Sequence, residues 1–251
     1  MSVSIIALSA VVISSAQAND ITQKLDLKNF SKVILDVPAD LQISVGGDFS
    51  VTVSGNEERI KNTVFDISGD RLKIKRKKKN FSFFNKGYDG QMNILITMPD
   101  IEAMKIDGSG DTTITGVNNK ELELSIDGSG NLSMRGKSEK LEINIDGSGD
   151  VDVEDYRGKQ VNVEIDGSGD VDIEGSCEKL DIEIDGSGDV HAKKLTCIDV
   201  DVYVDGSGDS FVNASGSLKF DGDGSGNVDL YGNPSEVIDN FSKRNSNIRI
   251  H

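Results

Sequence analysis

The sequence has no tryptophan, and aromatic residues account for 5% of its 251 positions. The core must therefore be built mainly from aliphatic side chains. Histidine occurs twice, at His191 and His251, and a nucleophile or general base usually needs a positioned imidazole or carboxylate. Nucleophilic catalysis thus has almost no support. Beyond residue 18 no segment approaches the roughly 20 apolar residues that span a bilayer, so we expect no membrane span in the mature chain.

Basic residues are scarce relative to acidic ones. The chain has 27 Lys and Arg against 43 Asp and Glu, which gives a formal net charge of −16. Between Ile101 and Tyr231 there are 11 basic and 30 acidic residues, so the rest of the chain carries a charge of +3. An acidic segment of this kind repels nucleic acid and anionic lipid headgroups. We expect no nucleic-acid partner, and we expect cations or basic surfaces to be favoured.

The tetrapeptide Asp-Gly-Ser-Gly recurs seven times, at successive steps of 20, 19, 20, 19, 20 and 18 residues. A fixed period of this length is typical of a solenoid, in which each copy buries its apolar face against the next. The copies begin at Asp107, Asp127, Asp146, Asp166, Asp185, Asp205 and Asp223.

Aligning the copies on that Asp shows alternation of apolar and polar residues on both sides of the turn. The position before the Asp is Ile in five copies, Val204 in the sixth and Gly222 in the seventh. Period-two alternation bounded by glycine predicts strands with one buried face. Each repeat then has two short strands and two connections, and equivalent strands pair in parallel and in register. The sequence predicts an all-β, right-handed parallel β-helix with about 20 residues per coil.

Four segments follow from these patterns. Residues 1–18 are uncharged and apolar and end in Ala16-Gln-Ala18, which predicts a signal peptide and an exported protein in the periplasm, at the cell surface or secreted. Residues 19–100 are expected to form irregular N-terminal β coils with a basic loop. Residues 101–232 form the regular β-helix, and residues 233–251 a C-terminal cap in which Val237, Ile238 and Phe241 lie across the last coil.

The candidate basic contact loop has two interpretations. One is a strand running into a mobile, solvated hairpin loop. The other is electrostatic docking onto acidic envelope polymers or onto the acidic rod of another copy. Its basic residues are Arg71, Lys73, Lys75, Arg76, Lys77, Lys78 and Lys79.

Stacked carboxylates form a candidate calcium site. Four residues after each turn Asp stands a second acidic or amide residue, and neighbouring carboxylates at the strand spacing repel one another. Calcium could relieve this repulsion; alternatively the side chains accept hydrogen bonds from turn amides and stay solvated. Besides the seven turn Asp residues, the candidate ligands are Asp150, Asp170, Asp189 and Asp209, in a column that also holds Asp111, Asn131 and Asn227.

The two cysteines occupy equivalent positions. Cys177 and Cys197 each lie eight residues before a turn Asp, so on adjacent coils their Cα separation approaches the strand spacing and falls within the range of a disulfide. An exported protein meets an oxidising compartment, which favours the bond. The alternative is two free buried thiols whose Cβ vectors run too parallel to be joined.

Repeated Ser-Gly-Asp/Asn turns after alternating strands, the signal peptide and the Pro99-Asp-Ile lead-in resemble the bacterial auto-transporter adhesin head, or GIN, domain family over Ile21 to Ile250. The resemblance implies a right-handed β-helix and an envelope or secreted location, and no catalytic residues are carried over from it. We therefore expect a noncatalytic adhesion or interaction module that contacts an envelope or extracellular protein or polysaccharide through its acidic face. The alternative is a polysaccharide-processing enzyme, with or without calcium. An isolated Arg or Lys among groove carboxylates would favour the enzyme.

Overall fold

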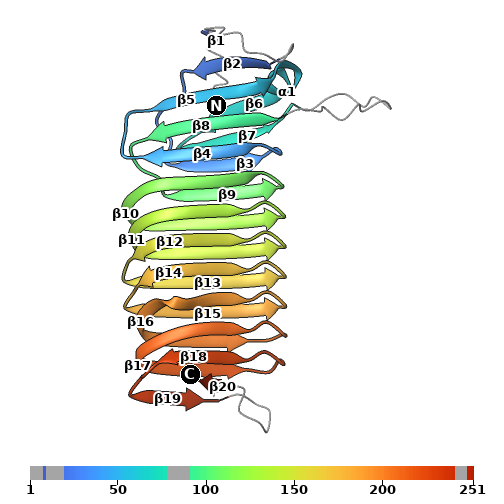
Figure 1. Cartoon of the computed structure of the whole chain (residues 1–251). Coiled ribbons are helices and arrows are strands. Elements are labelled where there is room, and N and C mark those ends of the chain that lie inside the picture. The colour runs from blue at the N-terminus through green and yellow to red at the C-terminus, as the bar shows by residue number, and fades with distance from the viewer. Residues whose placement is uncertain (1–7, 10–19, 78–90, 241–247) are drawn as a thin grey trace, which may run out of the picture.

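A computed structural model describes residues 8–9, 20–77, 91–240 and 248–251. The chain forms a stack of strand-rich coils about 20 residues long, and the predicted β-solenoid is confirmed (Figure 1). In the described part of the chain one short helix, α1 (Glu57–Lys61), occurs, and no helix there is long and apolar enough to cross a membrane. The predicted signal peptide lies outside the described residues except for Leu8–Ser9.

The strands of the described residues are numbered in chain order, which differs from their order along the stack at the N-terminal end. They are β1 (Leu8–Ser9), β2 (Asp20–Leu25), β3 (Lys32–Asp36), β4 (Asp40–Val45), β5 (Ser50–Asn56), β6 (Thr63–Ser68), β7 (Arg71–Arg76), β8 (Met92–Met98), β9 (Ala103–Gly108), β10 (Asp111–Gly128), β11 (Leu132–Gly147), β12 (Val151–Arg157), β13 (Gln160–Gly167), β14 (Val171–Ser176), β15 (Lys179–Gly186), β16 (Val190–Val204), β17 (Ser210–Gly222), β18 (Val228–Gly232), β19 (Glu236–Asp239) and β20 (Ile248–Ile250).

Equivalent residues of successive repeats are paired in parallel. Ile145, for example, stands opposite Ile126 on one side and Ile165 on the other. Each of these side chains is at most 1% exposed, so the alternation predicted from the sequence correctly divides inward from outward positions. Thr112 and Ser210 interrupt one inward column and are buried, and their hydroxyls lack a hydrogen-bond partner.

The Asp-Gly-Ser-Gly corners stack backbone on backbone. Gly128 and Gly147 have φ angles of +144° and +148°, which residues with a Cβ rarely adopt. The amide of Ser148 donates to the carbonyl of Gly128 in the preceding coil at 2.8 Å. Glycine is required here both by the backbone angle and by the close approach of the neighbouring coil.

The second connection lies within a continuous strand in some repeats and separates two strands in others, as between β12 and β13. Strands β10, β11, β16 and β17 run continuously through this corner. A bulge turns the chain instead, for instance between Thr115 and Val117, where Gly116 has a φ of +81°. The variable residues therefore remain hydrogen-bonded to their neighbours while the corner is turned.

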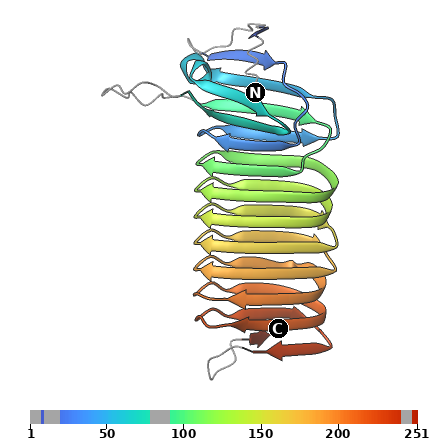
Figure 2. The ribbon, with the colours of Figure 1, turned by 180° about the vertical axis from the view of Figure 1, so that it is seen from behind.

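The regular stack begins earlier in the chain than expected. Strand β3 pairs in parallel with β9, and β4 with β10, so residues 32–45 form a coil in register with the repeats. Strands β7 and β8 add another coil outside it. Antiparallel strands β6, β5 and β2 cover the N-terminal end of the stack (Figure 2). This antiparallel layer protects the edge that a bare solenoid would present.

The C-terminal segment does not lie across the last coil as predicted. Strand β19 pairs in parallel with β17, and β20 with β18. Val237 and Ile238 continue the register and are 41% and 39% exposed, whereas Phe241 lies outside the described residues. In-register addition satisfies backbone hydrogen bonds that a crossing segment would leave unpaired.

Candidate functional site

We call the outward side chains of the strands that end at the Asp turns the lead-in face. Parallel register places equivalent outward residues of successive coils side by side, as for Glu164 and Glu183. The face carries a groove of about 370 Å³ whose one basic lining residue is Lys219. Its carboxylates are Glu142, Glu164, Asp181, Glu183, Asp201 and Asp221. The sequence predicted an acidic face but not this hollow.

Tyr203 is the aromatic residue of this groove. It lies between Glu183 and Asp221 in the parallel register and is 43% exposed. An exposed aromatic ring beside carboxylates can stack on a sugar ring or attract a Lys or Arg side chain. The repeat alone indicates that Tyr203 points outward, but a single aromatic residue in an otherwise polar column carries no signal of a groove.

Lysine links neighbouring coils at the edge of the groove. The ammonium of Lys179 lies 2.5 Å from Asp181 and 3.2 Å from Asp201. The hydrogen bond to Asp181 is the main cause that raises the pKa of Lys179 above its ordinary value. These pairs reduce the repulsion between carboxylates on adjacent coils.

The column of turn Asp residues extends one coil further than the repeats. Asp36 follows Leu35, which is paired with Ile106, and it therefore occupies the position equivalent to Asp107. Lys73 relieves the repulsion at this end, because its ammonium lies 3.2 Å from the Asp36 carboxylate and 3.6 Å from the Asp107 carboxylate. Across residues 20–77, 91–240 and 248–251, no group of three or more His, Cys, Asp or Glu is placed to hold a metal ion.

The second column has partners within the protein. From Asp111 to Asp209, one side-chain oxygen of each residue in this column accepts the backbone N–H of the equivalent residue in the next coil. The amide of Asp170 thus donates to the Asp150 carboxylate at 3.0 Å, and the amide of Asp189 donates to the Asp170 carboxylate at 2.9 Å. Asp209 likewise donates to Asp189 at 2.7 Å. This pattern favours the interpretation in which the side chains accept turn amides, and calcium binding stays a prediction.

The strands after the turns carry a second acidic cluster on what we call the follow-on face. Burial is the main cause that raises the pKa of Asp152, followed by the charges of Glu154, Asp172 and Glu174. Arg135 pairs with Glu154, and the Lys194 ammonium pairs with Glu174. Sequence reasoning missed this cluster because its members read as ordinary outward positions.

The two cysteines are joined. Cys177 and Cys197 form a disulfide between adjacent coils, with Cα atoms 4.6 Å apart. Cys177 follows strand β14 and Cys197 lies within β16, so the bond links two coils at their second corner.

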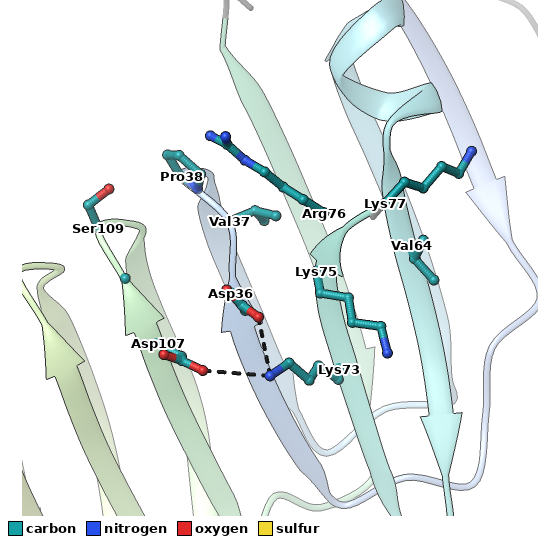
Figure 3. A pocket seen from close by; sticks show the side chains of 11 residues that line it. Asp36, Val37, Pro38, Val64, Lys73, Lys75, Arg76, Lys77, Asp107 and Ser109 are labelled. Carbon is teal, nitrogen blue, oxygen red and sulfur yellow. Dashed lines mark ion pairs between the residues drawn. The ribbon is translucent and has the colours of Figure 1, made fainter. Parts of the chain in front are cut away.

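The first part of the basic segment is a strand, as the first of the two interpretations expects. Arg71–Arg76 is strand β7, paired on both sides with β3 and β6, and Lys78 and Lys79 lie outside the described residues. Its alternating lysines point outward because Leu72 and Ile74 are fully buried. Together with the turn of β3 and the first repeat turn they surround a pocket of about 820 Å³ (Figure 3).

Comparison with known proteins agrees with this architecture. No curated protein matches the chain. Among solved structures, a "putative lipid binding protein" from Parabacteroides distasonis is 23% identical with a TM-score of 0.83, covering 93% of this chain and 97% of that chain. A "putative adhesin" from Parabacteroides merdae is 17% identical with a TM-score of 0.81 and the same coverage. Identities this low show a shared fold.

The sequence also matches the model of a known protein family. The family described as "Putative auto-transporter adhesin, head GIN domain" matches residues 29–151 and 132–234. These ranges include the early coil at residues 32–45 as well as the seven repeats. The resemblance inferred from the turns is confirmed, and the chain belongs to the head GIN domain family.

Proposed function

We propose that the protein is an exported, noncatalytic interaction module that contacts an envelope or extracellular partner through its lead-in face. The observation that carries the proposal is the acidic groove with the exposed Tyr203. Carboxylates supply long-range attraction for basic groups, and a central aromatic side chain is a frequent anchor in interfaces. The family description as an adhesin head supports an adhesion-like role.

The rigidity of the coil stack supports a contact surface. Backbone pairing fixes each outward residue relative to its neighbours, so a partner meets a preorganised array, which lowers the entropic cost of binding. The apolar N-terminal stretch supports export, and the disulfide supports an oxidising compartment. The periplasm, the cell surface and the medium are all compatible with these features.

A pull-down from envelope fractions tests the proposal. The bait is compared with a groove variant, Glu164→Gln/Glu183→Gln/Asp201→Asn. A matched control, Asp172→Asn/Glu174→Gln/Glu154→Gln, changes the same charge on the follow-on face. We expect the groove variant to lose a partner that the control retains. If both variants retain the partner equally, the groove is not the contact surface. If both lose it equally, the partner responds to the net charge of the protein and not to the groove.

One observation favours the enzymatic alternative. Lys219 is the single basic residue lining the groove, among several carboxylates, and such a residue could orient an acidic or hydroxylated substrate. By contrast the turn Asp column continues without interruption from Asp107 to Asp223, so no pair of carboxylates is singled out. Release of reducing sugar from envelope polysaccharides, lost on Lys219→Met, would support the enzyme.

A further inference from the structure

The basic pocket is a separate feature of the N-terminal end of the stack. It lies where the turn after β3, the strand β7 and the first Asp-Gly-Ser-Gly turn meet (Figure 3). Its volume of about 820 Å³ lies within the range of small-molecule sites. The lining includes four basic side chains, against the carboxylates of Asp36 and Asp107. The basic residues are Lys73, Lys75, Arg76 and Lys77.

Two of these lysines are fixed by carboxylates. Lys73 bridges Asp36 and Asp107, as the dashed lines in Figure 3 show. Lys75 lies 2.7 Å from Asp66. The hydrogen bond to Asp36 is the main cause that raises the pKa of Lys73. The carboxylates therefore hold these ammonium groups in place as one wall of the pocket.

The other two cations are placed differently. Neither Arg76 nor Lys77 forms an ion pair with a carboxylate in the described part of the chain, although the Lys77 ammonium donates to the carbonyl of Lys61. A third cation is close: the Arg59 guanidinium donates to the carbonyl of Pro38. Burial is the main cause that lowers the pKa of Arg59, and the charge of Arg76 is the second.

This arrangement is unusual for a chain with surplus acid. The chain has 43 Asp and Glu against 27 Lys and Arg, yet Arg76 and Lys77 form no ion pair within the described residues. Instead like charges gather at one end, where they repel one another unless an anion lies between them. The guanidinium of Arg76 can grip phosphate or sulfate through two parallel hydrogen bonds.

We propose that this pocket binds a saccharide that carries a phosphate or sulfate group. Arg76 and Lys77 hold the oxyanion, and the hydroxyl of Ser109 lies at the rim to meet a sugar hydroxyl. The walls formed by Val37, Pro38 and Val64 supply apolar contact for the ring. A bare phosphate would leave most of the 820 Å³ unfilled. The acidic coils repel the same ligand along the rest of the stack, so binding is confined to the N-terminal end.

Isothermal titration calorimetry at low ionic strength tests the assignment. The probes are glucose 1,6-bisphosphate and a sulfated heparin tetrasaccharide, with glucose and inorganic phosphate as references. We expect both charged saccharides to bind, at least tenfold more tightly than inorganic phosphate, and glucose not to bind. Arg76→Gln/Lys77→Gln should weaken binding at least tenfold, the loss of one charge-assisted hydrogen bond. Lys159→Gln/Lys194→Gln removes the same charge from other coils and should leave the affinity unchanged.

Three outcomes would overturn the assignment. Equal affinity for inorganic phosphate and for the charged saccharides would show that the pocket does not recognise the sugar. Equal weakening in both double variants would show a general charge effect. Binding to phosphatidylglycerol vesicles without binding to either soluble saccharide would point to a membrane surface instead. Melting temperatures of both variants confirm that they fold. The groove variant of the lead-in face should still bind the charged saccharides. The saccharide proposal and the proposed function can therefore fail independently of each other.

Discussion

Two glycines with the same backbone angle should respond very differently to alanine. Gly108 and Gly147 occupy equivalent corner positions, with φ angles of +146° and +148°. A Cβ at Gly108 would have no atom within 4 Å, whereas one at Gly147 would lie less than 3.0 Å from the carbonyl oxygen of Gly128. Backbone strain alone costs about 1–3 kcal/mol at either position. The difference in the free energy of unfolding between the two variants therefore measures the cost of disturbing the close stacking of coils.

The extra cost at Gly147 has two parts. The coils must separate at this corner, which weakens the hydrogen bond from Ser148 to Gly128, about 0.5–1.5 kcal/mol. Overpacking adds about 1–3 kcal/mol. We expect Gly147→Ala to lower the free energy of unfolding by about 1.5–4.5 kcal/mol more than Gly108→Ala does, measured by urea denaturation with circular dichroism. Equal losses would refute the stacking of corners as the reason for glycine.

Four further results are expected. Ile145→Asp should cost more than about 4 kcal/mol because it places a charge in the core, whereas Asn144→Asp should change stability by less than about 0.5 kcal/mol; similar melting temperatures would contradict the assignment of faces. Unfolded, unreduced protein should show no free thiol on labelling, and two thiols per chain would contradict the disulfide. The raised pKa of Asp152 means that the folded state binds its proton more tightly than the unfolded state, so the parent loses stability as pH rises above 3.8; Asp152→Asn should be more stable than the parent near pH 7 and equal to it well below pH 3.8. Because the second column already accepts backbone amides, a chelator should leave the melting temperature unchanged and Asp166→Asn should be no less stable; a chelator-dependent loss in the parent, weakened in Asp166→Asn, would instead support calcium.

The sequence was sufficient to predict the repeats because each inward residue stacks on its own equivalents in the neighbouring coils. Ile145 is paired with Ile126 in one neighbouring coil and with Ile165 in the other, so the repeat period itself predicts these neighbours. The cysteines were paired by the same argument. Where a residue is surrounded by copies of its own column, local pattern and tertiary contact carry the same information.

The early coil could not be found in this way. Its turn, Asp36-Val-Pro-Ala-Asp40, retains the two acidic residues of the repeat but none of the glycines. Its structural neighbour is β9, more than sixty residues later in the chain, because strands β5 to β8 are inserted between them. Pairing across such an insertion is a nonlocal contact, and the repeat spacing in the sequence cannot predict it.

Departures from the repeat carry the candidate sites, and this follows from the physics of stacking. A residue that must fit its equivalents above and below is constrained by packing, so an outward residue that breaks its column is free of that constraint. Tyr203 breaks a polar column and lines the groove. Lys75 stands opposite Asp36, where the column would place an acid, and lines the basic pocket. Specific binding in a solenoid of this kind therefore resides in its irregular outward positions, while the regular ones hold them in place.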